Sequence, residues 1–174
     1  ELLIEVWGER TQVLGANDEI EYVLPFENRG AEVGVTLHHP HGQIYAYPVV
    51  PPVPARMQGA ASGYYAENGR GVLETLIADE LRVDERIVYR GEAVVAFVPV
   101  CARYPYEVWI APIEPVARLS ELSAVQRRDL ARGLKTVLLK YDGLWKRPFP
   151  YLMAWYQAPT DGRAHPEWHV HAEF

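Results

Sequence analysis

Two short stretches of the sequence each carry a pair of histidines separated by one residue. The first runs over residues 39–43 and the second over residues 169–173, and in both a polar side chain follows two positions later. Because the chain has six histidines among 174 residues, random placement gives only about 0.2 such pairs. The repetition therefore indicates a repeated element and, with it, two related halves of the chain.

The first stretch, with His39, His41 and Gln43, suits chemistry at a phosphate group. In an extended strand, next-but-one side chains lie on one face about 6.6 Å apart, so we expect these three to form a row. A neutral imidazole can attack phosphorus, and a carboxamide N–H can bond a non-bridging phosphate oxygen. A pair of metal ligands, or two surface histidines beside the proline turn, would also fit this spacing.

The second stretch carries His169, His171 and Glu173. Two imidazoles and a carboxylate on one strand face could bind a metal ion, but a polar face with an internal ion pair fits them equally well. His165 precedes a proline in a polar loop, and we expect it to be solvated. Cys101 has no second cysteine beside it, so we expect a small buried side chain at a strand end.

The periodicity of the apolar residues predicts an α+β fold with mainly antiparallel sheets and packed helices. Helices are expected over residues 1–14, 72–81 and 123–141, the last opened by a capping box of Ser123 and Gln126. Strands are expected over residues 21–26, 33–37, 87–89, 93–98, 106–111, 151–156 and 168–174, and the extended structure of 33–37 is expected to continue through residues 38–45. The proline-rich stretch 48–54 is expected to run extended over the surface.

Composition limits the partners. The net charge is −6, with 23 acidic and 17 basic residues and no basic cluster, so nucleic acid is not expected as a partner. No apolar run is long enough for a membrane span. One cysteine cannot form an intramolecular disulfide and fits a reducing compartment, so we expect a cytoplasmic protein. The first helix starts without an N-cap and the last strand ends without a turn, which leads us to expect a part of a larger polypeptide.

Residues 26–31, Gly34 and the string His-Pro-His-Gly-Gln-Ile at residues 39–44 closely resemble the active-site segment of galactose-1-phosphate uridylyltransferases. The resemblance continues through residues 64–67, 103–107, 140–142, 149–151 and 168–172, and so covers essentially the whole chain. This family belongs to the histidine-triad superfamily and has two similar α+β halves. The resemblance implies that residues 1–60 are the C-terminal portion of an incomplete first domain and residues 61–174 the second.

The resemblance also implies a ping-pong nucleotidyl transfer. His41 would attack the α-phosphorus of UDP-glucose and release glucose 1-phosphate, and galactose 1-phosphate would then take the uridylyl group from the histidine. Gln43 would bond the phosphoryl oxygens of this intermediate. Asn28, Gly34 and Thr36 match positions that line the nucleotide or phosphate site, although Asn28 before a glycine also suits a turn. A related enzyme with an adenylyl donor and a non-catalytic assembly module are the alternatives.

Two metal sites of the family bear on this chain. His39 matches a zinc ligand in the members that carry zinc, but the other ligands would come from an upstream segment. The second site of some members uses one glutamate and three histidines. The matching positions here hold Met57, Tyr156, His171 and Glu173. A thioether and a phenol are poor ligands for hard cations, so we expect this second site to be lost, with His171 the one ligand retained. The implied partners are the two substrates and either a homodimer subunit or an upstream polypeptide.

Overall fold

The computed structural model describes residues 1–36 and 39–174. Its strands are β1 Tyr22–Arg29, β2 Gly42–Tyr47, β3 Ile87–Arg90, β4 Val94–Phe97, β5 Trp109–Pro112, β6 Tyr151–Tyr156 and β7 His171–Glu173. The α-helices are α1 Leu2–Gly15, α2 Pro52–Asn68, α3 Val72–Val83 and α4 Ala124–Trp145, and η1 Ala31–Val33 and η2 Leu119–Glu121 are 3₁₀ turns.

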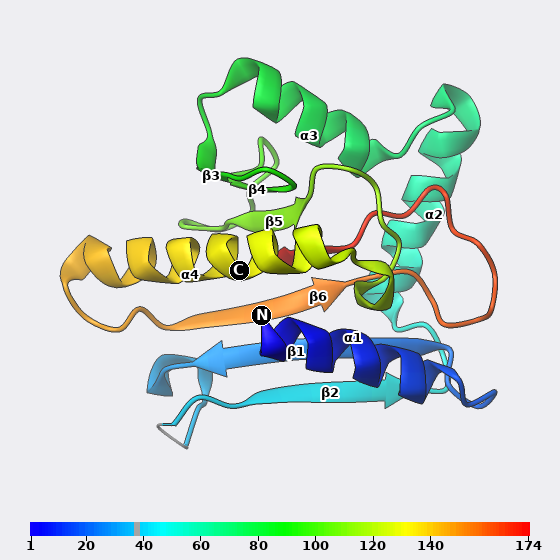
Figure 1. Ribbon diagram of the computed structural model, residues 1–174, viewed down its shortest axis with the longest axis horizontal. Helices are drawn as coiled ribbons and strands as arrows, with labels where there is room; N and C mark the ends of the chain where they lie inside the picture. The colour runs from blue at the N-terminus through cyan, green and yellow to red at the C-terminus, as the bar shows by residue number, and fades with distance from the viewer. Residues whose placement is uncertain (37–38) are drawn as a thin grey trace.

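One seven-stranded sheet forms the centre of the structure, in the order β2-β1-β6-β7-β5-β4-β3 (Figure 1). Every pair of neighbours is antiparallel, so the predicted α+β class with a mainly antiparallel sheet is confirmed. β6 and β7 lie between β1 and β5, so strands from both ends of the chain share one sheet. Residue 60, the predicted domain boundary, lies within α2, and the division itself stays a prediction.

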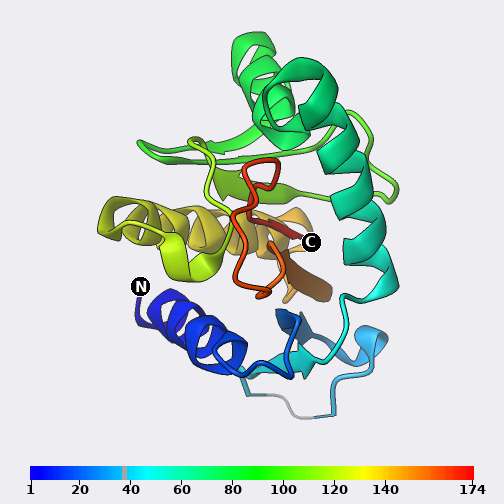
Figure 2. The same ribbon diagram turned by 90° about the vertical axis from the view of Figure 1, so that its right-hand side faces the viewer.

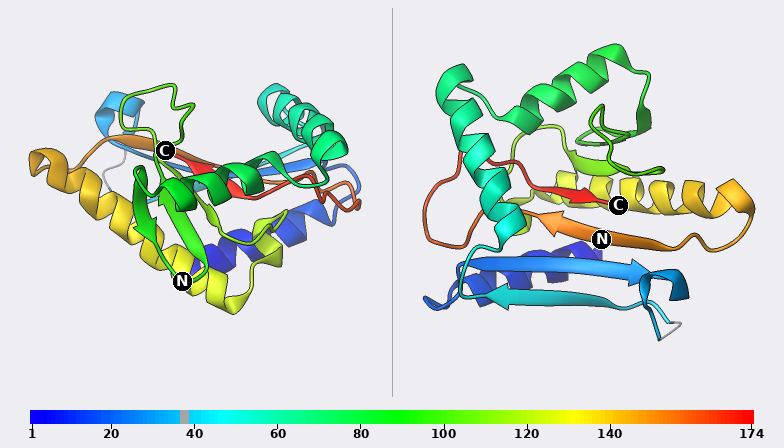
Figure 3. Two further views of the ribbon diagram at one scale, coloured as in Figure 1. Left: turned by 90° about the horizontal axis from the view of Figure 1, so that it is seen from above. Right: turned by 180° about the vertical axis from the view of Figure 1, so that it is seen from behind.

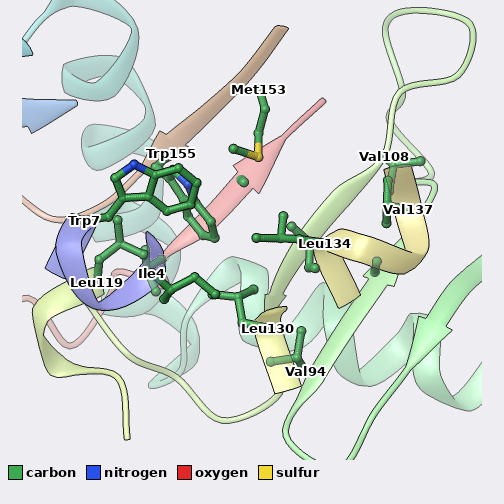
Figure 4. Packing of buried hydrophobic residues seen from close by; sticks show 14 of the residues in the cluster. Ile4, Trp7, Val94, Val108, Leu119, Leu130, Leu134, Val137, Met153 and Trp155 are labelled. Atoms are coloured by element: carbon green, nitrogen blue, oxygen red, sulfur yellow. The ribbon is translucent and has the colours of Figure 1, made fainter. Parts of the chain in front are cut away.

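Helices α1 and α4 cover one face of this sheet (Figure 3, left). Their apolar side chains form the main core together with alternate residues of the strands, and Figure 4 shows Trp7 of α1 beside Trp155 of β6. The two indole centroids are 5.8 Å apart. Because successive strand side chains point to opposite faces, this core fixes which strand residues face the other way.

The opposite face is covered unevenly. α3 packs there on β4 and β5 through a smaller core that includes Ile77, Val95 and Phe97. α2 descends along one side of the molecule from α3 toward the end of β2 (Figure 2). Among the described residues, most of the surface formed by β2, β1 and β6 has no helix over it (Figure 3, right), and we call this surface the open face.

Three of the predicted elements are wrong. The stretch 48–54 was expected to be extended, but Pro52 begins α2. Proline is compatible with a first helical turn because the N–H groups there have no intrahelical partner. The strand expected over 33–37 is replaced by η1 and the left-handed Gly34, and residue 37 lies outside the described residues. β5 begins only at Trp109 because Tyr106 has a positive φ of 68°, which a strand does not allow.

The remaining helix and strand predictions are confirmed to within a few residues, except that β7 is shorter than expected. No helix in the described ranges combines the length and the apolarity needed to cross a membrane.

The capping box of α4 provides a test of the fold. Oγ of Ser123 accepts from the backbone N–H of Gln126 at 3.2 Å, and the Gln126 side chain accepts from the N–H of Ser123 at 2.9 Å. Ser123→Ala should lower the free energy of unfolding by about 1 kcal/mol, because one helix N–H loses its partner. Urea unfolding followed by circular dichroism measures this. Ser62→Ala, an exposed position inside α2, is the control and should not destabilise the protein.

Candidate active site on the open face of the sheet

The register of β1 and β2 decides which side chains reach the open face. Ile44 packs against the core under α1 and α4, so its neighbours Gln43 and Tyr45 point the other way. Phe26 is the Cα partner of Gln43 on β1 and therefore shares this face. Asn28, two residues further along β1, also lies on it.

His41 directly precedes β2, and its ring is held by the backbone. Nδ1 of His41 lies 2.9 Å from the carbonyl oxygen of His39. Since a carbonyl oxygen can only accept, Nδ1 carries the hydrogen, and Nε2 of the neutral ring keeps its lone pair. The imidazole is thus held in the tautomer that a nucleophile needs.

The predicted row of three side chains on one strand is only partly correct. β2 begins at Gly42, and His39 lies in a bend before it, exposed to solvent. The His39 and His41 rings are 5.8 Å apart and inclined at 64°. His39 therefore contributes its carbonyl group to His41, and its own ring faces solvent.

Asn28 connects β1 to the turn that follows it. Its side-chain amide donates to the carbonyl of Val33 at 3.4 Å, which agrees with the turn-holding role. Gly30 has a φ of 110°, and a Cβ there would lie 2.7 Å from Pro150. Gly34 has a φ of 82°, with open space where a Cβ would be, and Thr36 is exposed. Gly30 is therefore required by its close approach to Pro150, whereas the absent side chain of Gly34 leaves its backbone accessible.

A set of contacts of Arg29, which we call the Arg29 clamp, holds this end of β1 from the face of the sheet that α4 covers. The sequence did not reveal it. Arg29 forms an ion pair with Asp142 of α4 and donates to the carbonyl of Phe149 at 2.9 and 3.1 Å. Asp142 also accepts from the N–H of Phe149 at 2.9 Å. Burial raises the pKa of Asp142, but the N–H of Phe149 and the guanidinium outweigh it and hold this pKa below its usual range. Arg29 stands next to Asn28, so the clamp fixes the backbone that carries Asn28.

The second histidine row repeats the local geometry of the first. Nδ1 of His171 lies 2.9 Å from the carbonyl oxygen of His169, as in the His41 pair. His171 is buried, however, with Trp109 and Tyr156 flanking its ring at 5.4 and 5.6 Å between centroids. Burial lowers the pKa of His169 to about 4, so its ring is neutral at pH 7. The same motif is therefore accessible in the first row and covered in the second.

Glu173 ends the second row in an internal ion pair. Its carboxylate contacts the guanidinium of Arg103, which also donates to Glu107 at 2.9 Å. Burial raises the pKa of Glu173, but His171 and Arg103 outweigh burial and hold it below its usual range. Nε2 of His171 is 3.5 Å from the same carboxylate. Glu173 is thus neutralised by groups of this chain.

The residues present do not fit the second metal site that the resemblance implies. Met57 lines an apolar cavity of about 240 Å³ between α2, α3 and the sheet, together with His169 and His171. Nδ1 of His169 is buried without a hydrogen-bond partner, and Nε2 of His171 has only the carboxylate of Glu173 near it, at the long distance of 3.5 Å. In the described part of the chain, no three histidine, cysteine or carboxylate side chains gather closely enough to hold a metal ion. His39 likewise supplies only one imidazole toward a zinc ion.

Two smaller expectations are wrong. His165 is buried, with its ring nitrogens 3.0 Å from Glu167 and 2.9 Å from Asp161. Two carboxylates within reach make burial of the ring favourable, which the sequence of a polar loop did not indicate. Cys101 is exposed, because the segment between β4 and β5 leaves the sheet there.

Comparison with known proteins shows which family the chain resembles. Residues 58–174 match the family described as galactose-1-phosphate uridyl transferase, C-terminal domain, and residues 1–51 match its N-terminal domain. The galactose-1-phosphate uridylyltransferase of Thermotoga maritima is 41% identical over the whole chain. The chain belongs to the galactose-1-phosphate uridylyltransferase family. It spans about half the length of the curated relatives it matches, 54% of the Thermotoga protein and 49% of the one from Haemophilus influenzae.

Solved structures of this family and its neighbours share the fold. A structure described as uridylyltransferase superposes with a TM-score of 0.92 at 34% identity, over 98% of this chain and 53% of that one. An ADP-glucose phosphorylase from Arabidopsis thaliana, solved with bound ADP-glucose, has a TM-score of 0.88 at 26% identity, over 98% and 54% of the two chains. The resemblance read from the motifs is therefore confirmed.

The buried contacts of His165 predict a dependence of stability on pH. Burial raises the pKa of Asp161, but hydrogen bonds from His165 and Arg163 outweigh it and lower this pKa to about 2, against 3.8 for the free group. A lowered carboxyl pKa stabilises the fold above the free value, and the stabilisation is lost as the pH falls toward 2. This contribution of Asp161 to the free energy of unfolding amounts to about 2 kcal/mol above pH 4.

Asp161→Asn should therefore lose less stability than the unmodified protein between pH 4 and pH 2, as measured by urea unfolding at several pH values. Asp18→Asn, an exposed position, is the control and should keep the slope of the unmodified protein. Equal slopes for the protein and Asp161→Asn would contradict the assignment.

Proposed function

We propose that this protein, in its complete form, transfers a uridylyl group between UDP-glucose and galactose 1-phosphate through a covalent uridylyl-histidine at His41. The observation that carries the proposal is the contact of Nδ1 of His41 with the carbonyl of His39, which leaves Nε2 free on an accessible face. The names of the curated relatives support the choice of substrates.

In the first half-reaction, the lone pair of Nε2 attacks the α-phosphorus of UDP-glucose. A P–N bond forms and the P–O bond to the β-phosphate breaks, so glucose 1-phosphate leaves with the electron pair. The ring becomes cationic, and its Nδ1–H stays bonded to the carbonyl of His39, which stabilises the charge.

In the second half-reaction, a phosphate oxygen of galactose 1-phosphate attacks the same phosphorus. The P–O bond of UDP-galactose forms while the P–N bond breaks, and Nε2 regains its lone pair. The attacking oxygen is already ionised, so neither step needs a general base. The covalent intermediate thus divides one uridylyl transfer into two displacements at the same phosphorus.

Four other groups are assigned to the nucleotide and its phosphates. The carboxamide N–H of Gln43 donates to the phosphoryl oxygens as their charge develops. Asn28 and the turn containing Gly34 approach the phosphates or the ribose, and Thr36 offers a hydroxyl. Zinc remains part of the proposal only for the complete protein, with His39 as one ligand whose further ligands lie outside this chain.

The edge of the sheet bears on the proposed partners. β2 is an edge strand in the described structure, and α1 beside it exposes Leu2, Leu3 and Val13. Unpaired strand edges and exposed apolar side chains favour association. We therefore include in the proposal a polypeptide on this edge, either an upstream segment or the second subunit of a homodimer, in a cytoplasmic enzyme.

The nucleophile can be tested by intact mass. After incubation with UDP-glucose, the complete protein should carry a uridylyl adduct that His41→Ala abolishes. His171→Gln is the matched control, because it alters the histidine with the same local geometry in the buried row, and the adduct should persist. An adduct that survives in His41→Ala would overturn the assignment. ADP-glucose in place of UDP-glucose tests the adenylyl alternative.

The isolated chain distinguishes the complete enzyme from an incomplete one. If this segment alone gives no adduct and addition of the upstream polypeptide restores it, the site is completed by that polypeptide. If no adduct forms in either case, the result favours a non-catalytic assembly module and contradicts the proposed enzyme.

We propose further that the second histidine row binds no metal and that Arg103 supplies the positive charge beside Glu173. After incubation with Fe²⁺ or Zn²⁺ and desalting, elemental analysis should give the same metal content for the protein and for His171→Gln. The double variant Met57→Glu with Tyr156→His restores oxygen and nitrogen ligands and should gain metal relative to both. One equivalent of metal lost on His171→Gln would refute the proposal.

A further inference from the structure

Tyr45 makes a contact that the proposed reaction does not yet use. Its hydroxyl donates to Oε1 of Gln43 at 3.2 Å. The two residues are next-but-one neighbours on β2, so both side chains lie on the open face. Among the hydrogen bonds of the described residues, this is the one made by the Gln43 side chain.

We propose that Tyr45 is a positioning residue that orients the carboxamide of Gln43 toward the phosphate. This inference rests on the proposed function, in which Gln43 donates an N–H to the phosphoryl oxygens. Tyr45 itself touches neither the phosphate nor His41 in this account.

The need for such a residue follows from the chemistry of an amide. A carboxamide has an oxygen that accepts and a nitrogen that donates, and a rotation of 180° about its last bond exchanges them. With the oxygen turned toward the phosphate, Gln43 would repel the phosphoryl oxygens that it has to stabilise. A phenol hydroxyl is a better donor than acceptor, because its oxygen lone pair is delocalised into the ring. Tyr45 therefore favours the orientation in which Oε1 faces its hydroxyl and the NH₂ group is directed elsewhere.

The ring of Tyr45 is itself held in place. It meets Phe26 edge-on, with centroids 4.9 Å apart and planes at 77°, and Tyr47 at 6.0 Å and 79°. Such edge-to-face pairs are favourable geometries for aromatic rings. Phe26 is also the cross-strand partner of Gln43, so one aromatic side chain borders both members of the hydrogen bond. The hydroxyl is thus directed at Gln43 by packing on two sides.

The kinetic test uses Tyr45→Phe in the complete protein. This variant keeps the ring and its packing but removes the donor. The rate of uridylyl-adduct formation should fall about 5-fold, as expected for loss of one neutral hydrogen bond, while the affinity for UDP-glucose stays unchanged. Tyr47→Phe is the matched control on the same face of the same strand and should leave the rate unchanged.

A double variant separates positioning from any independent effect. In the Gln43→Ala background, Tyr45→Phe should have no further effect on the rate, because there is no amide left to orient. An equal loss of rate with and without Gln43 would overturn the proposal, and so would an unchanged rate in Tyr45→Phe alone.

A measurement without catalysis keeps this inference separate from the proposed function. The side-chain NH₂ signals of Gln43, assigned by their loss in Gln43→Ala, should shift or broaden in the ¹⁵N NMR spectrum of Tyr45→Phe and not of Tyr47→Phe. If the unmodified protein forms no adduct, the proposed function fails, while these spectra still decide whether Tyr45 orients Gln43. Identical Gln43 signals in the protein and in Tyr45→Phe would refute the contact.

Discussion

The pairing of β1 with β6 is the constraint on which the rest of the structure depends. It joins residues near the start of the chain to residues near its end, in a ladder from Phe26↔Ala154 to Arg29↔Tyr151. The ladder places β1 and β2 in the same sheet as the second histidine row. The Arg29–Asp142 ion pair and the cation–π contact of Arg29 with Tyr151 at 5.0 Å strengthen it from the α4 side. Together with the core that Ile44 of β2 shares with α1 and α4, this ladder positions the strand that carries Gln43 relative to α4.

The sheet also explains why the two His-x-His motifs, which share a local geometry, differ in their exposure to solvent. In each, the second histidine donates from Nδ1 to the carbonyl of the first, at 2.9 Å in both cases. His171 points to the face opposite α1 and α4, since its neighbour Ala172 packs into that core, and His41 directly precedes β2, whose Gln43 lies on the same face. α2 then covers the end of the sheet near His171, while His41 remains outside it. Accessibility, rather than local geometry, separates His41, the proposed nucleophile, from the buried His171 beside its ion-paired Glu173.

Much of the site could be predicted because its residues are close together in the sequence. His41 and Gln43 lie on one segment, whose spacing suits phosphate chemistry, metal binding or surface histidines, and the longer family motif favoured phosphate chemistry. The Arg29 clamp could not be foreseen, because its partners are more than a hundred residues away and each has an ordinary local sequence. The contact of Tyr45 with Gln43 was within reach of the strand alternation. It was missed because a tyrosine in a strand is usually explained by packing.

The sequence by itself determined the class of fold, most of the helices and strands, the family and the candidate nucleophile. These follow from local periodicity, capping signals and a short motif, none of which needs distant contacts. Only the tertiary structure decided that Pro52 opens a helix, that His165 is buried between two carboxylates, and that Glu173 is bound to Arg103. Each of these depends on which residues the fold places next to one another. Burial and ion pairing depend on neighbours in space, which the order of residues does not state.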